Sequence, residues 1–169
     1  MHSDPLAYFI TYRTHGTWLP GDDRGSTRHS PDCNGNKSHT ANPSLNVHTG
    51  WHSANAVTLD HQMRDVVTHK IAEVCEHYDW VLIALNVRSN HVHIVVQGDK
   101  KPEQMMNAFK SWSTRRLRER GLMRDDVKVW ARHGSTRYLF YPREVEYAAW
   151  YTNEAQDGER FDPDSAVES

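Results

Sequence analysis

The sequence has few of the features that mark secreted, membrane-spanning or disulfide-stabilised proteins. Its 169 residues include two cysteines, Cys33 and Cys75, which are too few for a disulfide framework and favour a reducing cytoplasm. No apolar run approaches the roughly 18 residues that a transmembrane helix needs. The opening stretch, MHSDPLAYFI, lacks the basic region and long apolar segment of a secretory signal. We therefore expect a cytoplasmic protein that does not engage a membrane.

Excess positive charge is also missing, since the formal net charge is −2 at pH 7. The charges are unevenly distributed, however. Residues 110–120 contain five basic side chains and one acidic one, whereas acids outnumber bases after Asn153. Because the field near a protein surface is local, such a basic segment can bind phosphates in a mildly acidic protein. A solvated helix face has the same composition, so both interpretations stay open at this point.

What the chain does contain is an alternation of strand-like and helix-like segments. Residues 6–14 are rich in aromatic and β-branched side chains and are typical of a strand. Apolar residues at helical spacing predict a helix over about 58–78. Residues 80–88 and 91–97 are separated by a short Ser-Asn turn and predict a hairpin. A second long helix is predicted over 103–120, just after Pro102 and just before Gly121.

The end of the chain predicts one more strand and one more helix. Either residues 128–132 or residues 138–141 supply the fourth strand. Pro142 is expected to begin a last helix that runs to about Gln156. The stretch 15–54 is rich in Gly, Pro, Ser, Asn and Asp and shows no sustained period, so it is interpreted as a long loop.

The resulting order is strand, helix, strand, strand, helix, strand, helix. Its first six elements predict an α+β fold of the ferredoxin-like, split βαβ type, with an antiparallel sheet and two helices on one face. We expect a single domain over residues 1–158, with 15–54 as a loop insertion. The acidic residues 159–169 have the composition of a disordered tail.

Two histidines occupy alternate positions in the second strand of the predicted hairpin. Successive side chains of a strand point to opposite faces, so His91 and His93 share one face while Val92, Ile94 and Val96 share the other. This parity places the apolar side chains under the helices and the two imidazoles on the opposite face, where they can share one divalent ion. A chain with 12 histidines can also contain this spacing by chance.

The last helix carries the remaining candidate groups. Tyr147, Tyr151, Asn153, Glu154 and Gln156 are concentrated in about three turns of it. A tyrosine can attack a phosphate when its proton is removed or when a metal polarises the phosphate. A tyrosine close to a two-histidine metal pair is therefore consistent with phosphoryl transfer.

The His91-Val92-His93 motif, followed by a helix with a tyrosine and an amide, resembles the HUH superfamily. Within it, the chain is similar to the one-tyrosine transposases of the smallest insertion sequences and to their REP-associated relatives. The segments YFITYRTHGTWLPGD, VWARHGSTRYLF and YTNEAQDG add to this resemblance, which extends from about Leu6 to Gly158.

The resemblance implies an endonuclease that nicks single-stranded DNA at hairpin sites and then transfers the strand. It implies Tyr151 as the nucleophile, with Tyr147 as the alternative, and a 5′-phosphotyrosine intermediate. It also implies a magnesium or manganese ion bound by the two histidines and one donor from the tyrosine helix. That donor usually lies one turn after the tyrosine, where this chain has Ala155, so Gln156 is the expected third ligand and Glu154 the alternative. Homodimers are common among the members.

The basic segment supplies candidate DNA contacts. We expect four of its side chains to contact phosphates: Lys110, Arg115, Arg116 and Arg118. Trp112 either packs in the core or stacks on a base. Arg132 and Arg137 flank a Gly-Ser turn whose backbone amides could also bind a phosphate.

Other functions fit parts of the same pattern. A ferredoxin-like nucleic-acid-binding module without catalysis would share the fold, although its open sheet face usually displays stacking aromatics rather than histidines. A replication initiator or a conjugative relaxase would share the chemistry. A domesticated transposase would keep the fold and DNA binding and lack transposition.

Overall fold

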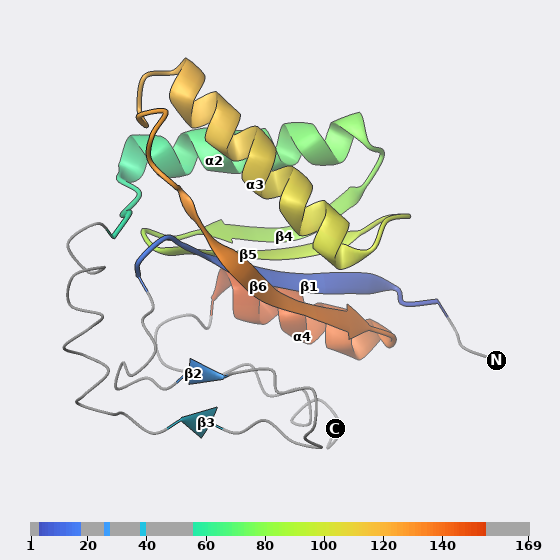
Figure 1. The fold of residues 1–169 in the computed structure, drawn as a ribbon. Helices are drawn as coiled ribbons and strands as arrows, with labels where there is room; N and C mark the ends of the chain where they lie inside the picture. Colours follow the sequence, from blue (N-terminus) through green and yellow to red (C-terminus); the bar gives the residue numbers. More distant parts are fainter. Residues whose placement is uncertain (1–3, 18–25, 28–37, 40–55, 155–169) are drawn as a thin grey trace.

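The computed structural model describes residues 4–17, 26–27, 38–39 and 56–154. Four antiparallel strands form one sheet in the order β4-β5-β1-β6, which is the strand order of a ferredoxin-like fold (Figure 1). The strands of this sheet are β1 (Ala7–Thr14), β4 (Val81–Val87), β5 (His91–Gln97) and β6 (Trp130–Leu139). The predicted α+β fold is confirmed.

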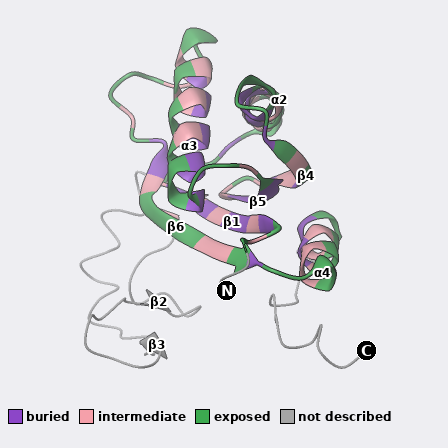
Figure 2. Cartoon of the chain, turned by 90° about the vertical axis from the view of Figure 1, so that its right-hand side faces the viewer, coloured by how far each residue is buried: buried purple, intermediate pink, exposed green. Residues whose placement is uncertain are grey.

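Among the described residues, three helices accompany the sheet: α2 (His61–His77), α3 (Pro102–Glu119) and α4 (Pro142–Asn153). Helices α2 and α3 cover one face of the sheet and α4 covers the other, as Figures 1 and 2 show from two directions. A separate two-stranded ribbon pairs β2 (Ser26–Thr27) with β3 (Ser38–His39). Otherwise most of the predicted 15–54 loop, the whole 159–169 tail and Gln156 lie outside the described residues.

The helices begin where local sequence signals place them, and α4 ends at Asn153, before the predicted end near Gln156. The Asp60 side chain accepts a hydrogen bond from the Met63 amide at 2.8 Å and caps the start of α2. Pro102 and Pro142 occupy the first turns of α3 and α4. After α3, Gly121 adopts a φ of 68°, a conformation that glycine adopts with little strain and that commonly ends a helix.

The last strand differs from both sequence expectations. The segments 128–132 and 138–141 were alternatives, but a single ten-residue strand, β6, extends across the interval between them. Its Gly134-Ser135 step lies within the strand and pairs with Tyr12 and Thr11 of β1. The Gly-Ser pair had indicated a turn, but pairing along the whole of β1 keeps the backbone extended.

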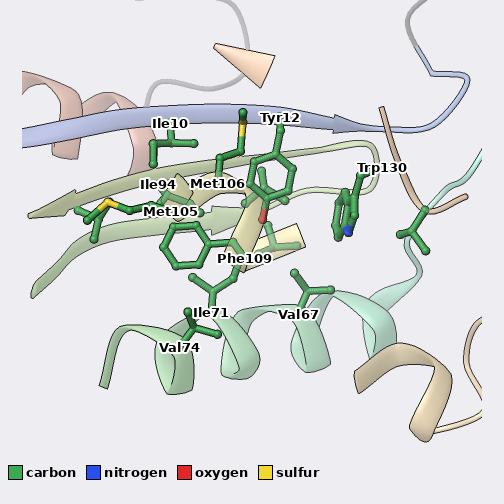
Figure 3. Close-up of a cluster of buried hydrophobic side chains, with 14 of the residues drawn as sticks. Ile10, Tyr12, Val67, Ile71, Val74, Ile94, Met105, Met106, Phe109 and Trp130 are labelled. Carbon is green, nitrogen blue, oxygen red and sulfur yellow. The ribbon is translucent and has the colours of Figure 1, made fainter. Parts of the chain in front are cut away.

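The main hydrophobic core lies between the sheet and the α2–α3 layer. It contains fully buried residues of both layers, including Ile10, Ile71, Ile94, Met105 and Phe109 (Figure 3). A smaller cluster lies beneath α4 on the other face and includes Phe9, Val95, Leu139 and Ala148. Within the described residues, no helix combines the length and apolarity needed to cross a bilayer.

Candidate functional site

Strand β5 presents its two histidines to the face of the sheet that α4 covers. Val92, Ile94 and Val96 belong to the main core beneath α2 and α3. The alternating side chains point the other way, and Val95 accordingly packs in the smaller cluster with α4. The parity predicted for this strand is confirmed, so both imidazoles lie on the α4 side.

The two imidazole rings are close together and each is held at one nitrogen. Their centroids lie 4.8 Å apart, with an interplanar angle of 84°. Nδ1 of His93 lies 2.9 Å from the hydroxyl of Thr11, which is directly opposite it on β1. Nδ1 of His91 donates to the side-chain oxygen of Asn90 at 2.6 Å. Such bonds fix the orientation of each ring and leave its Nε2 as the nitrogen that can bind a ligand.

His93 is neutral at physiological pH. Its side chain is buried, and burial disfavours the charged imidazolium, so its pKa is lowered from 6.5 to about 3. The neighbouring His91 and the charges of Arg13 and Arg88 lower this pKa in the same direction. A neutral imidazole has the lone pair that metal coordination requires.

Helix α4 brings Tyr151 to this pair of histidines. The Tyr151 ring meets the His93 ring edge-on, with centroids 5.9 Å apart and an interplanar angle of 88°. It meets the Phe9 ring in the same manner at 6.1 Å. Tyr147 lies one turn earlier and packs instead on Trp150 at 5.6 Å. The phenol of Tyr151 and the two imidazoles therefore share one face of the sheet.

The position of Tyr151 is set by contacts on either side of it in the helix. Ala148 and Thr152 are fully buried. The backbone carbonyl of Thr152 accepts a hydrogen bond at 2.9 Å from the Asn86 side chain of β4. Asn86 and Thr11 were not singled out in the sequence, because their roles depend on which residues lie opposite each other across strands.

The third metal ligand is not settled by the described part of the chain. Gln156 lies outside the described residues. Glu154 is exposed just after α4, and within the described ranges no three His, Cys, Asp or Glu side chains lie close enough to hold a metal together. The two imidazoles would supply two donors to a bound ion and would leave its other positions to water or substrate oxygens. The third donor stays a prediction.

A basic groove lies on the other side of the sheet, between α3 and the start of β6. We call it the α3–β6 groove, and its volume is about 920 Å³. Five cations line it against two acids, Glu119 and Asp125. The cations are Lys110, Arg115, Arg118, Lys128 and Arg132. Four of the six predicted DNA contacts therefore lie in one groove, and Lys128 joins them.

Lys110 has a structural role within this groove. Its side chain is buried, and its ammonium donates to the backbone carbonyls of Ala131 at 3.0 Å and His133 at 3.3 Å. It also lies 5.3 Å from the centre of the Tyr12 ring. Burial, with a smaller effect of nearby Lys128, lowers the pKa of Lys110 to about 8. These contacts anchor α3 to β6, and the phosphate contact expected of Lys110 from the sequence stays a prediction.

Two of the predicted DNA contacts lie elsewhere. Arg116 turns toward α2 and lies 3.4 Å from the Glu73 carboxylate. Arg137 is opposite Phe9 in the β1–β6 pairing, so it projects on the α4 face of the sheet. Trp112 packs against the main core beside His77, which answers the question left open for this side chain.

Comparisons with known proteins identify similar sequences and folds. Residues 43–139 match the family described as "Transposase IS200 like". A candidate transposase of Deinococcus radiodurans R1 is 12% identical, with a TM-score of 0.51 over 90% of this chain and 93% of that one. A REP-associated tyrosine transposase, solved with a REP hairpin, is 12% identical, with a TM-score of 0.46 over 90% of this chain and 67% of that one. No curated protein matches the chain significantly.

Proposed function

We propose, since the chain belongs to the IS200-like transposase family, that it cuts and rejoins single-stranded DNA with Tyr151 as its nucleophile. The observation that carries this proposal is the edge-on contact between the Tyr151 and His93 rings, 5.9 Å apart at their centroids. Tyr147, the other candidate, packs on Trp150. A nucleophile that is already beside its activating groups needs little reorganisation to react.

In the proposed step the phenolic oxygen of Tyr151 attacks the phosphorus of a phosphodiester. A bond forms between that oxygen and phosphorus, and the bond from phosphorus to the 3′ oxygen breaks. The phenol releases its proton to solvent, and the departing oxygen takes one up and becomes a 3′-hydroxyl. The product is a 5′-phosphotyrosine. Because the new ester keeps the phosphoryl bond energy, a 3′-hydroxyl can reverse the step and join strands without a nucleotide cofactor.

The histidines are suited to hold the ion that the family resemblance implies. We assign Nε2 of His91 and His93 as the ligands, because Nδ1 of each ring is engaged by Asn90 or Thr11. A bound magnesium or manganese ion would polarise the phosphate oxygens as a Lewis acid. Two imidazole donors favour manganese, since magnesium prefers oxygen ligands.

The α3–β6 groove is our proposed site for the paired stem of a DNA hairpin. Its exposed cations can meet phosphates of both strands, and its two acids leave a positive balance. The phosphate contacts that we assign are Arg115, Arg118, Lys128 and Arg132. The groove and Tyr151 lie on opposite faces of the sheet, so the stem and the cut bond are held separately.

The test uses labelled single-stranded DNA with the hairpins that flank the gene, in the presence of manganese. We expect a covalent protein–DNA band that survives denaturation. Tyr151→Phe should abolish this band, whereas Tyr147→Phe, the matched change one turn away, should keep it. His93→Ala should reduce it strongly, and a chelator should remove it in the unaltered protein.

The results separate the competing functions. A band that persists in Tyr151→Phe and is lost in Tyr147→Phe would show that the nucleophile is misassigned. Tight hairpin binding by the unaltered protein without any band, over a range of metals, would instead support a non-catalytic or domesticated DNA-binding protein.

A further inference from the structure

Three aromatic side chains at and just after the end of β6 are substantially exposed. Tyr138 is 41% exposed, Phe140 42% and Tyr141 58%, although rings of this size are usually mostly buried. We call Tyr138, Phe140 and Tyr141 the β6 aromatic patch. Figure 2 shows that β6 is exposed along much of its length, because it is an edge strand of the sheet.

The rings of the patch are arranged in a way that suits flat ligands. The Tyr138 and Phe140 rings are nearly parallel, with an interplanar angle of 17° and centroids 6.4 Å apart. The Tyr138 ring also contacts the Tyr8 ring, with perpendicular planes and centroids 5.2 Å apart. Every nucleic acid base has a π-face that can stack on an exposed aromatic ring.

The backbone beneath the patch is held in place. The Glu144 carboxylate accepts hydrogen bonds from the backbone amides of Phe140, at 2.7 Å, and of Tyr141, at 3.1 Å. Arg143 lies over the Tyr141 ring, 5.6 Å from its centre. Because these contacts already order the segment, a ligand that stacks on the rings loses little binding energy to ordering it.

The patch lies where β6 leads into α4, farther from the groove along the sheet than Tyr151, because His93, which contacts Tyr151, is level with Ser135 of β6. Tyr138 is opposite Tyr8 and therefore projects on the same sheet face as the α3–β6 groove. From Ala131 in the groove to Tyr138 the strand advances about 23 Å, at 3.3 Å per residue. From Tyr141, which precedes α4, to Tyr151 the helix advances about 15 Å, at 1.5 Å per residue. The patch thus marks the corner where the chain passes from the groove face to the tyrosine face.

The charge around the patch suits bases better than phosphates. Glu103, which accepts a hydrogen bond from the Thr136 hydroxyl at 2.8 Å, and Glu144 both lie beside it. Their carboxylates offset Arg137 and Arg143, so the patch lacks the positive balance of the groove. Stacking of a base on an aromatic ring does not require a cation.

We propose that the β6 aromatic patch stacks unpaired bases of the single-stranded DNA that is joined to the stem in the α3–β6 groove and cut at Tyr151. This inference rests on the proposed function and adds a subsite to it, with single-stranded DNA as the occupant. About four stacked nucleotides, at 3.4 Å each, match the 15 Å between the patch and Tyr151. Contact with flat π-faces accepts any base, so the subsite holds the strand without reading its sequence.

The test measures the affinity of the protein for two DNA ligands. One is a hairpin that carries a ten-nucleotide single-stranded extension, and the other is the same hairpin without the extension. Tyr138→Ala and Phe140→Ala should each weaken binding of the extended hairpin about 5- to 100-fold, the range for loss of one stacked base. Binding of the blunt hairpin should change less than twofold. The slope of affinity against salt should stay the same, because no phosphate contact is removed.

Two conservative variants separate stacking from general apolar contact. Tyr138→Phe keeps the ring and should bind the extension normally, whereas Phe140→Leu keeps an apolar side chain without a ring and should bind as poorly as Phe140→Ala. Normal binding by Phe140→Leu would overturn the proposal. An equal loss of affinity for both hairpins would also overturn it. So would a change in oligomeric state, measured by light scattering, that accounts for the lost affinity.

This proposal and the proposed function can fail separately. Tyr151→Phe should bind the extended hairpin as the unaltered protein does and still form no covalent band. If the unaltered protein forms no band but the extension effect depends on the patch rings, only the cleavage chemistry fails. If the band forms normally and the patch variants bind the extension normally, only the stacking subsite fails.

Discussion

The buried Lys110 gives the most specific prediction about the stability of this fold. Its pKa is lowered from 10.5 to about 8, mainly by burial and secondarily by Lys128. Below pH 8 the ammonium is charged in both the folded and the unfolded chain. Between pH 8 and 10.5 the folded protein releases this proton while the unfolded chain keeps it. The free energy of unfolding therefore rises with pH across this window.

The size of this rise follows from the pKa difference. Each unit of pKa corresponds to about 1.4 kcal/mol, so the contribution of Lys110 is at most about 3 kcal/mol. Lys110→Met keeps the apolar stem and removes the titrating group. The unfolding free energy of Lys110→Met should lack the Lys110 contribution. The difference in unfolding free energy between the unaltered protein and Lys110→Met should therefore grow by about 3 kcal/mol from pH 7 to 10.5.

Urea unfolding at pH 7, 8, 9 and 10, followed by circular dichroism, measures this difference. Lys128→Met is the matched control, since Lys128 lines the same groove but is exposed, and it should keep most of the rise. Parallel stability curves for the unaltered protein and Lys110→Met would refute the reasoning. DNA binding gives a second comparison: Lys128→Met should reduce the salt slope by about 1 and Lys110→Met should not.

Three further predictions concern the sheet and α4. Gly134→Ala should destabilise the fold by about 2 kcal/mol in urea, because its Cβ would lie 2.6 Å from the Thr11 carbonyl oxygen, and unchanged stability would contradict this contact. Asn86→Ala should cost about 1 kcal/mol by removing the bond to the Thr152 carbonyl and should slow covalent bond formation; normal cleavage would argue against anchoring of α4 by this bond. Thr11→Val removes the hydroxyl beside Nδ1 of His93 and should weaken manganese binding about tenfold in calorimetry, whereas unaltered affinity would show that this hydroxyl does not orient the ring.

Local signals in the sequence were sufficient for the helix starts, for strands β1, β4 and β5, and for the histidine face. The Pro102 and Pro142 positions and Gly121 mark helix ends through the backbone conformations that these residues favour. Strand alternation places His91 and His93 away from the helices that cover the apolar residues of β5. Each of these inferences depends only on neighbours within a few residues.

Features that depend on cross-strand register or on distant neighbours could not be read from the sequence. Thr11 lies opposite His93 only because β1 and β5 pair in one particular register. Arg116 directly follows Arg115 in the sequence, but successive side chains of a helix point in different directions, and Arg116 faces Glu73 of α2. Arg132 and Arg137 are five residues apart, and this odd spacing within one strand indicates opposite faces once β6 is known to be continuous.

The chemistry proposed for Tyr151 is tested most directly by locating the covalent bond to DNA. Trypsin should cut after Arg143 and Arg160 and release one peptide that contains both Tyr147 and Tyr151. Fragmentation of the DNA-linked peptide by tandem mass spectrometry should place the nucleotide on Tyr151. A nucleotide found on Tyr147, on a residue outside this peptide, or on no residue of a protein that nevertheless cuts the strand would contradict the account.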